Sequence, residues 1–452
     1  MALRRVLPLP SVRFAVVACL ALAALTLLGP HQPTYDPWAW LNWGREITHG
    51  QLDTVGGPSW KPFPVLFTTP FSLLGASAPQ LWLVIARAGL LLAFVAAFRL
   101  AASVAGPVAG AVAVAGIALV DRFAPLTARG NSEGLLAAFA LGAVDRHRSG
   151  HRGQALALGF AAGLVRPEVW PYLGLYALWL AWTRPTRRDR LRALALIGAG
   201  GVVLLVAWFV PEKLGSGSIL RGASRALEAV EGSPAQTAHP FLAVFGNSAG
   251  AVAPSLYAGA LLAVLLALRT RARLVLLLAA ASASYMVIVG ILAQVGFTGN
   301  ERYVLLPASM VCVLGGIGLV QGSTLLASRL GQRWAAAALV GVAGIAFAVS
   351  PAQRLARQIN DAQRESDLYD HIGAVVRRAG GRAAIERCGK VYTDPFQTQV
   401  VLWQLHLRGA AIGIHPVPPG TIIAPATTPA GRDARFRLLV RHGGWVVRST
   451  CR

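Results

Sequence analysis

Residues 80–100 read QLWLVIARAGLLLAFVAAFRL, and only Gln80, Arg87 and Arg99 interrupt their apolar character. A helix needs roughly 20 residues to cross about 30 Å of hydrocarbon, so this stretch predicts a transmembrane helix. Ten further stretches repeat this character, although two of them are short. The predicted spans are 11–29, 80–100, 103–120, 132–145, 154–167, 168–183, 193–211, 251–268, 273–293, 303–321 and 334–350. The predicted fold class is therefore an all-α polytopic membrane protein with about eleven transmembrane helices.

The composition excludes a soluble enzyme. Of the 452 residues, 55% are hydrophobic and 13% are charged, whereas an average soluble domain has about 25% charged residues. The net charge of +23 would suggest a nucleic-acid partner in a soluble chain. Here the basic clusters lack an aromatic platform for bases, so we expect no nucleic acid. The sequence has neither of the glycine-rich loop motifs that bind nucleotide phosphates.

Arginines on alternate connections between the spans indicate the orientation. They cluster at 146–152, 184–192, 269–273 and 329–333. Short basic loops remain in the cytoplasm, so we predict a multi-pass protein of the plasma membrane with a cytoplasmic N-terminus. The predicted domains are a transmembrane domain at 1–350 and a small extracytoplasmic α/β domain at 351–452. Cys388 and Cys451 lie in the second domain, where an oxidising compartment permits a disulfide.

The first outer loop, 30–79, is the most aromatic part of the chain. Asp36 followed by Pro37 is a strong helix-start pattern, with Asp36 as N-cap. Trp40 and Trp43 then recur at helical spacing, and Gly50 ends the helix. An amphipathic helix with a tryptophan face is typical of a membrane–water interface. We therefore expect this helix to lie on the bilayer.

Lys61 follows in the same loop, between Trp60 and Pro62. At the depth of lipid headgroups, a lysine is suited to bind a phosphate as a point charge. The alternative interpretation is that Lys61 only extends its charge to the interface. For Asp36, the alternative is that its carboxylate only caps the helix.

The first outer loop resembles that of the GT-C superfamily of membrane glycosyltransferases. The resemblance rests on the acid Asp36 after the first span, the helix ending at Gly50 and the run Lys61-Pro62-Phe63-Pro64. The likeness is greatest to the bacterial branch with the aminoarabinose lipid A transferases and the protein O-mannosyltransferases. That branch has paired acids and Lys-Pro-Pro, where this chain has Asp36-Pro37 and Lys-Pro-Phe-Pro. The resemblance implies transfer of a sugar from a polyprenyl phosphate with inversion, and a GT-C-like fold.

Chemistry then indicates roles for individual residues. A carboxylate near the acceptor hydroxyl serves as general base, and Asp36 is the candidate, with Glu46 and Asp53 as fallback acids. Cations stabilise the departing phosphate; Lys61 and Arg302 are the candidates, Arg302 because GT-C members often carry Arg-Tyr in a late outer loop. Asn300 is the expected N-cap before Arg302. Further candidates for substrate binding are Tyr35, Arg129, Glu133, Arg166, Glu168 and Tyr303, each with a structural ion pair or packing role as the alternative.

The expected partners are a polyprenyl-phosphate sugar, the lipid bilayer, and an acceptor that is a cell-wall glycan, a lipid or a protein. The sequence indicates no definite cofactor and shows no metal-ligand spacing, although a divalent cation stays open. One rival function is a non-catalytic transporter or lipid flippase, which would place polar groups along a path through the bilayer midplane. Another is a polymer ligase that uses a diphosphate-linked donor.

Overall fold

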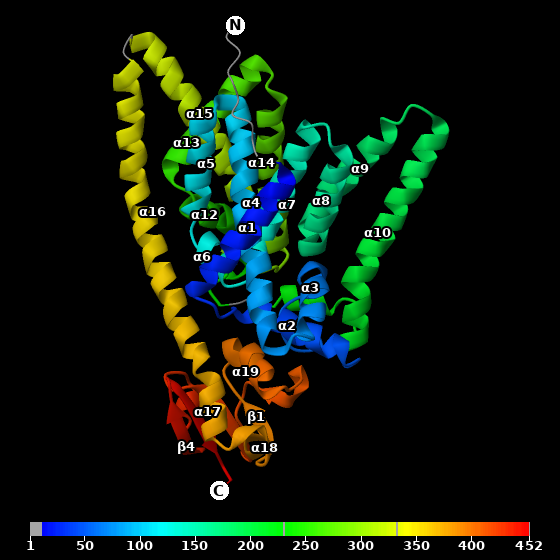
Figure 1. Ribbon diagram of the computed structural model, residues 1–452, viewed down its shortest axis with the longest axis vertical. Coiled ribbons are helices and arrows are strands. Elements are labelled where there is room, and N and C mark those ends of the chain that lie inside the picture. The colour runs from blue at the N-terminus through cyan, green and yellow to red at the C-terminus, as the bar shows by residue number, and fades with distance from the viewer. Residues whose placement is uncertain (1–10, 229–230, 331–332, 452) are drawn as a thin grey trace.

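The structure, a computed structural model, describes residues 11–228, 231–330 and 333–451. A tall bundle of helices forms the larger part of the molecule, and a small domain with a β-sheet lies at one end of it (Figure 1). Each of the eleven predicted spans overlaps a helix. These helices are α1 (Val12–Leu25), α4 (Ala78–Ala105), α5 (Pro107–Ala118), α7 (Glu133–Arg148), α8 (Arg152–Val165), α9 (Trp170–Trp182), α10 (Arg187–Ser216), α13 (Pro254–Thr270), α14 (Arg273–Gln294), α15 (Leu305–Leu330) and α16 (Arg333–Asp370).

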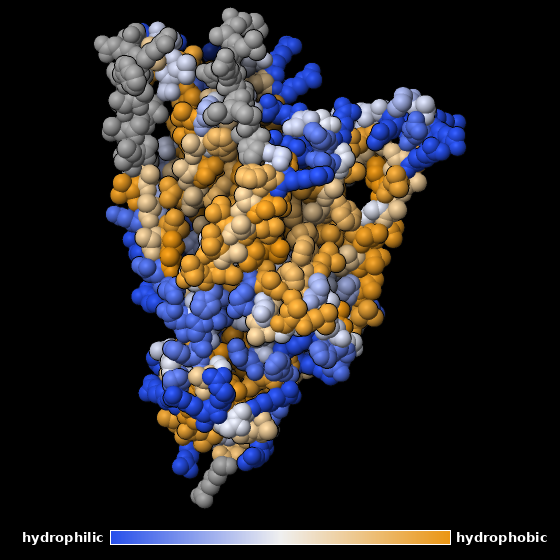
Figure 2. All heavy atoms as spheres, in the orientation of Figure 1, coloured by the Kyte–Doolittle hydropathy of each residue, from blue (hydrophilic) through white to orange (hydrophobic). Residues whose placement is uncertain are grey.

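Within the described residues, four helical stretches are long and apolar enough to cross a membrane: Gly75–Ala105, Arg187–Ser216, Arg273–Gln294 and Glu301–Arg329. A fifth span results if α12 (Pro240–Ala251) and α13, which meet at 105°, count as one. Several other predicted spans are helices of 12 to 16 residues, shorter than a straight crossing needs. The protein is an integral membrane protein, and the count of eleven spans stays a prediction. On the face shown in Figure 2, apolar side chains form a band across the middle of the bundle.

Small residues allow the central helices to pack closely. A Cβ atom at Gly318 of α15 would lie 1.8 Å from the carbonyl oxygen of Gly259 in α13. On another face of α15, a Cβ atom at Gly316 would lie 2.5 Å from the carbonyl oxygen of Ala109 in α5. Lipid tails are as apolar as leucine, so close backbone contact of this kind drives helix association in membranes. The three helices form a rigid centre on which the neighbouring loops are held.

Shorter elements lie between the long helices along the chain. They are α2 (Tyr35–Thr48), α3 (Pro62–Ser72), α6 (Phe123–Ala128), α11 (Arg221–Ala226), and the 3-10 helices η3 (Pro167–Val169) and η5 (Glu301–Val304). Helices α2 and α3 lie between the bundle and α19 (Figure 1). The α9–α10 connection, one of the predicted cytoplasmic loops, lies at the opposite end of the molecule (Figure 1).

The small domain contains a five-stranded mixed sheet in the order β2-β1-β3-β5-β4. Strands β1 (Lys390–Tyr392), β2 (Ile412–Gly413) and β3 (Gly420–Pro425) are parallel to one another, whereas β4 (Arg437–His442) and β5 (Trp445–Ser449) add antiparallel pairs. The helices are α17 (Ile372–Arg378), α18 (Gly381–Glu386) and α19 (Thr398–Leu405), with η8 at Ala430–Arg432. Helix α16 continues from the bundle into this domain, so the predicted boundary at residue 350 falls inside one helix.

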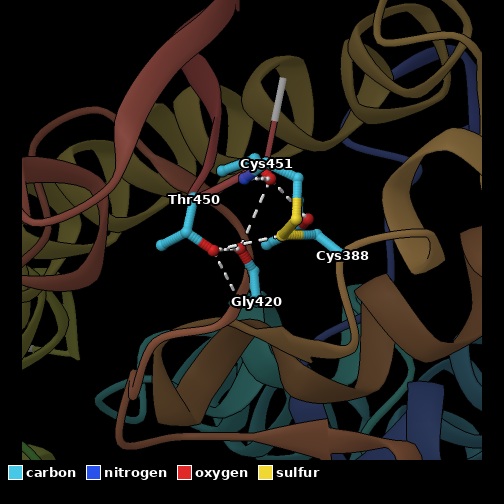
Figure 3. Close-up of a disulfide and its surroundings, with 6 residues drawn as sticks. Cys388, Gly420, Thr450 and Cys451 are labelled. Carbon is cyan, nitrogen blue, oxygen red and sulfur yellow. Dashed lines mark hydrogen bonds between the residues drawn. A yellow bond between two sulfur atoms is a disulfide. The ribbon is translucent and has the colours of Figure 1, made fainter.

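A disulfide joins Cys388 to Cys451, the alternative that the sequence left open (Figure 3). Cys388 follows α18, and Cys451 follows the last strand, β5. Their Cα atoms are 5.6 Å apart, and Thr450 beside them contacts the first residue of β3, Gly420. The bridge therefore fixes the C-terminal strand to the start of the domain.

The prediction that the tryptophan face of α2 lies on the bilayer is wrong. Trp40 packs edge-on against Trp82 of α4, and Trp38 lies 5.7 Å from Trp403 of α19, measured between ring centroids. Trp43 lies 5.3 Å from Trp60, also between ring centroids, and the rings of Trp38, Trp40 and Trp43 are almost fully buried. An apolar helix face requires an apolar partner but does not specify which one. Here the partner is protein on both sides, so α2 connects the bundle to the small domain.

Candidate active site

Six charged side chains, three basic and three acidic, meet where the bundle approaches α2. They come from five separate segments: α2, the residue before α3, the start of α7, the α8–η3 connection and η5. The residues are Asp36, Lys61, Glu133, Arg166, Glu168 and Arg302. We call this set the charge cluster. All six were candidates from the sequence, and the fold brings them together.

Glu133 lies at the centre of the charge cluster. Its Oε1 accepts hydrogen bonds from Arg166 Nη2 and from Arg302 Nε, both at 3.0 Å. Lys61 Nζ lies 4.0 Å from the same oxygen. The Glu133 side chain is fully buried, so its negative charge compensates three cations in a place that water does not reach. The second pair in this region joins Arg166 to Glu168 at 3.5 Å.

Asp36 is held by Arg302 instead of capping its helix. Its Oδ2 accepts a hydrogen bond of 2.8 Å from Arg302 Nη1. The helix begins one residue earlier than expected, at Tyr35, with Thr34 as N-cap and no side-chain hydrogen bond to the helix end. The prediction that Asp36 caps the helix is therefore wrong. The expected cap at Asn300 is confirmed, because its side chain accepts from the backbone N–H of Arg302.

Lys61 is oriented by two residues that the sequence interpretation did not assign to the site. Its Nζ donates to Ser132 Oγ at 3.2 Å and lies 5.2 Å from the ring centroid of Trp40. Ser132 immediately precedes Glu133, and that adjacency was the available signal. Burial lowers the pKa of Lys61 to about 8, and the nearby guanidinium of Arg166 lowers it in the same direction. Lys61 therefore loses its charge only slightly above neutral pH.

Four buried polar atoms in the charge cluster make no hydrogen bond within the described chain. They are the donors Arg166 Nε and Arg302 Nη2 and the acceptors Glu133 Oε2 and Glu168 Oε2. Buried polar groups in proteins are almost always paired, so each exception requires an explanation. Arg302 Nη2 still lies 2.9 Å from Glu133 Oε1 in an ion pair, so Arg166 Nε is the donor that has no partner. Together with the cations of Lys61 and Arg302, this N–H group forms a site suited to an anion. Arginine donates two parallel hydrogen bonds to a phosphate, and this favours recognition of that group.

The exposure of the side chains shows on which side the charge cluster opens. The Glu133 side chain is completely buried, whereas those of Asp36 and Arg302 are 15% and 22% exposed. The Asp36–Arg302 pair therefore forms the accessible edge, and Glu133 forms the floor.

Three other candidates lie in different surroundings. Tyr303 packs its ring 4.1 Å from the Arg166 guanidinium, so it borders the charge cluster. Tyr35 packs edge-on against Phe396 of the small domain. Arg129 donates to Glu365 of α16 and to the carbonyl oxygens of Gln32 and Pro33. The predicted substrate contacts of Tyr35 and Arg129 stay predictions, and the structure gives both residues packing roles.

The loop that carries Lys61 is held by residues outside the charge cluster. Glu212, in α10, is almost fully buried, and its Oε1 accepts the backbone N–H of Trp60 at 3.1 Å. Arg221 of α11 donates to the carbonyl oxygens of Val55, Gly57 and Pro58. The 55–60 segment is therefore tied to α10 and α11, and this fixes the position of the residue that follows it, Lys61.

The fallback acids have structural contacts of their own. Glu46 Oε2 accepts the backbone N–H of Asp53, and burial raises the pKa of Glu46 to about 7. Asp53 in turn accepts the backbone N–H groups of Val55 and Ala410. Among the described residues, no group of three or more His, Cys, Asp or Glu side chains is arranged to hold a metal ion.

No protein-family profile matches the sequence, and no curated protein matches it significantly. Solved structures do match the fold. ArnT from Cupriavidus metallidurans, in the apo state, aligns with a TM-score of 0.55 at 14% identity over 97% of both chains. The same protein bound to undecaprenyl phosphate gives a TM-score of 0.53 at 14% identity and the same coverage.

A second protein matches over most of the chain. The archaeal oligosaccharyltransferase AglB from Archaeoglobus fulgidus, in complex with an inhibitory peptide and a dolichol-phosphate, gives a TM-score of 0.52 at 12% identity. The alignment covers 91% of this chain and 69% of AglB. The chain thus shares the fold of ArnT and of the oligosaccharyltransferase AglB.

Proposed function

We propose that the protein is an integral membrane glycosyltransferase that moves a sugar from a polyprenyl phosphate to an extracytoplasmic acceptor. The observation that carries the proposal is the charge cluster, where Lys61, Arg166 and Arg302 lie behind the partly exposed carboxylate of Asp36 and Arg166 Nε has no partner. The likeness in fold supports it, because ArnT binds undecaprenyl phosphate and the AglB complex contains dolichol-phosphate.

The reaction requires a general base and cations, and residues of the charge cluster supply both. The acceptor hydroxyl oxygen attacks the anomeric carbon, the C–O bond to the donor phosphate breaks, and the phosphate leaves with the electron pair. Asp36 accepts the proton of the hydroxyl as general base. Lys61 and Arg302 stabilise the negative charge that develops on the phosphate. Attack from the side opposite the phosphate inverts the anomeric carbon.

Glu133 and Arg166 support this reaction from the buried side of the charge cluster. In the free protein, Glu133 compensates the cations and holds Arg302 through its Nε and Nη2 atoms. A fixed arrangement of charges costs no reorganisation when the phosphate charge develops, and this is the main source of electrostatic catalysis. Glu133 is thus a positioning residue, and Asp36, Lys61 and Arg302 contact the substrate.

The orientation follows from the basic loops. We place the α9–α10 connection in the cytoplasm and the charge cluster with the small domain outside. Thr48, at the end of α2, is exposed, and the two free cysteines of the described chain, Cys19 and Cys312, are buried. A membrane-impermeant thiol reagent will therefore label Thr48→Cys in intact cells, and His151→Cys only after permeabilisation. Labelling of His151→Cys in intact cells, with Thr48→Cys protected, would reverse the orientation.

Incubation of the purified protein with a panel of radiolabelled polyprenyl-phosphate sugars and crude envelope acceptors tests the function. The proposal predicts that label from at least one donor enters an acceptor and that polyprenyl phosphate is released. Transfer only from a diphosphate-linked donor would instead establish a polymer ligase. Movement of labelled lipid across a proteoliposome membrane, without transfer from any donor, would establish a flippase.

A further inference from the structure

The last part of the small domain carries a strong excess of positive charge. Residues 420–452 contain six arginines and a single acidic residue, Asp433. Asp433 is occupied by Arg435, whose Nη2 lies 2.7 Å from its Oδ2. The remaining arginines of this segment therefore have no nearby acid in their own segment to compensate them.

The sheet register places two of these arginines on one face. In β5, Trp445 and Val447 belong to the apolar core that includes α17 and α19. The alternation of a strand turns Val446 and Arg448 to the opposite face. On β4, Leu438 pairs with Arg448, and Arg441 pairs with Val446. These four residues thus share the face of the sheet that points away from the helices.

The 3-10 helix η8 covers only part of this face and leaves a cavity of about 410 Å³ beside the edge strand β4. We call this cavity the arginine cleft, because Arg432, Arg441 and Arg448 line it together with Leu438. The guanidinium of Arg448 is held in place by the carbonyl oxygens of Gly431 and Phe436 at 2.8 and 3.0 Å. Within the described part of the chain, the side chains of Arg432 and Arg441 form no hydrogen bond and no ion pair.

We propose that the arginine cleft binds an acidic glycan, a saccharide segment that carries carboxylate or phosphate groups. Arginine recognises both groups through two parallel hydrogen bonds, and the half-exposed side chain of Leu438 offers an apolar surface to a sugar ring. The volume falls within the range of small-molecule sites and is too small for the face of a folded protein. Resting on the proposed function, we assign this glycan as the acceptor.

Two observations favour a glycan over the other polyanions of a cell. The disulfide between Cys388 and Cys451, directly after β5, is typical of an oxidising extracytoplasmic compartment, where nucleic acids are not the expected partner. Strand β4 lies at the end of the molecule remote from the apolar band of the bundle (Figures 1 and 2). The cleft is therefore out of reach of the lipid headgroups around the bundle.

The test is a binding measurement that needs no donor and no turnover. The purified full-length protein, in nanodiscs of phosphatidylcholine, is titrated with tetragalacturonic acid and with neutral maltotetraose at two salt concentrations. The variant is Arg432→Ala/Arg441→Ala. The matched control is Arg377→Ala/Arg387→Ala, which removes the same charge from exposed positions of the same domain outside the cleft.

The proposal predicts that the acidic tetramer binds at least tenfold more tightly than the neutral one and weakens with salt. It also predicts that the cleft variant weakens this binding at least tenfold, whereas the control changes it less than twofold. Equal loss in both variants, or equal binding of both sugars, would overturn the proposal. Binding only to vesicles with anionic lipid would also overturn it and would make the cleft a membrane contact. The two proposals can be refuted separately. Absence of glycan binding would not contradict donor-dependent sugar transfer, and absence of transfer would not contradict glycan binding.

Discussion

Replacing Glu133 by glutamine removes the one negative charge that three buried cations share. Glu133 Oε1 lies 2.9 Å from Arg302 Nη2, 3.0 Å from Arg166 Nη2 and 4.0 Å from Lys61 Nζ. Glutamine has the same shape and still accepts one hydrogen bond, so packing is preserved while the charge is lost. Removing one partner of a buried ion pair costs about 3–5 kcal/mol. Because glutamine retains part of the hydrogen bonding, we expect a loss of about 3 kcal/mol, close to the lower limit.

The consequence that distinguishes function from stability is rescue by the donor headgroup. A phosphate bound beside Lys61, Arg166 and Arg302 supplies the charge that glutamine lacks. Ligand binding to the folded state stabilises it in proportion to affinity and concentration. Citronellyl phosphate, a short polyprenyl phosphate, should therefore raise the melting temperature of Glu133→Gln by several degrees more than that of the unmodified protein.

Helix α7 itself offers the matched control. Asp145, near the other end of α7, is also buried and pairs with Arg99 at 2.9 Å and with Arg146 at 2.7 Å. Asp145→Asn should destabilise the protein to a similar extent, but citronellyl phosphate should not restore it. Thermal melting of the detergent-purified variants, followed by tryptophan fluorescence, measures both effects. Equal rescue of the two variants, or rescue of neither, would refute the assignment of the charge cluster as a phosphate site.

Three further perturbations test single elements of the site. The pKa of Lys61 is about 8, and only its charged form attracts a phosphodiester, so kcat/KM for the donor should fall as pH rises through about 8. Lys61→Arg should abolish that fall. An unchanged pH profile in this variant would contradict the role of Lys61 in binding the donor phosphate. Glu212→Ala frees the backbone N–H of Trp60 and should raise the donor KM about tenfold with little change in kcat. Glu212→Gln should retain a normal KM. An equal increase of KM in both variants would indicate general misfolding. Burial raises the pKa of Glu46 to about 7, so the contribution of this side chain to stability is fully present below about pH 4.5 and is lost as pH rises through 7. Glu46→Gln should therefore stabilise the protein by up to about 3 kcal/mol at pH 8 and should not stabilise it at pH 4.5. Equal melting temperatures of the variant and the unmodified protein at pH 8 would contradict this.

The sequence was sufficient to predict the helices and much of the charge cluster. Apolar length marks the helices, and topology places the loops of Asp36, Lys61 and Arg302 at one end of the bundle, where they do meet. The cap at Asn300 could be read from local pattern because capping is a local interaction.

What the sequence did not show are the long-range partners. The helical spacing of Trp40 predicts an apolar face, but a single chain does not reveal whether lipid or α4 covers it. Likewise, Glu133 was only one of several acids near a span, because its pairing with Arg166 and Arg302 joins segments 33 and 169 residues apart. The capping role expected for Asp36 was wrong for the same reason, because its carboxylate pairs with Arg302, 266 residues further along the chain.

The central claim, that Asp36 takes the proton of the acceptor, is tested most directly by comparing single-turnover transfer in the unmodified protein and in Asp36→Asn. Asparagine still accepts the hydrogen bond from Arg302 Nη1, so the cations stay in place and donor affinity should change less than threefold. The account predicts a transfer rate about 10²- to 10⁴-fold lower. A rate within a few-fold of the unmodified protein, at full donor occupancy, would contradict it.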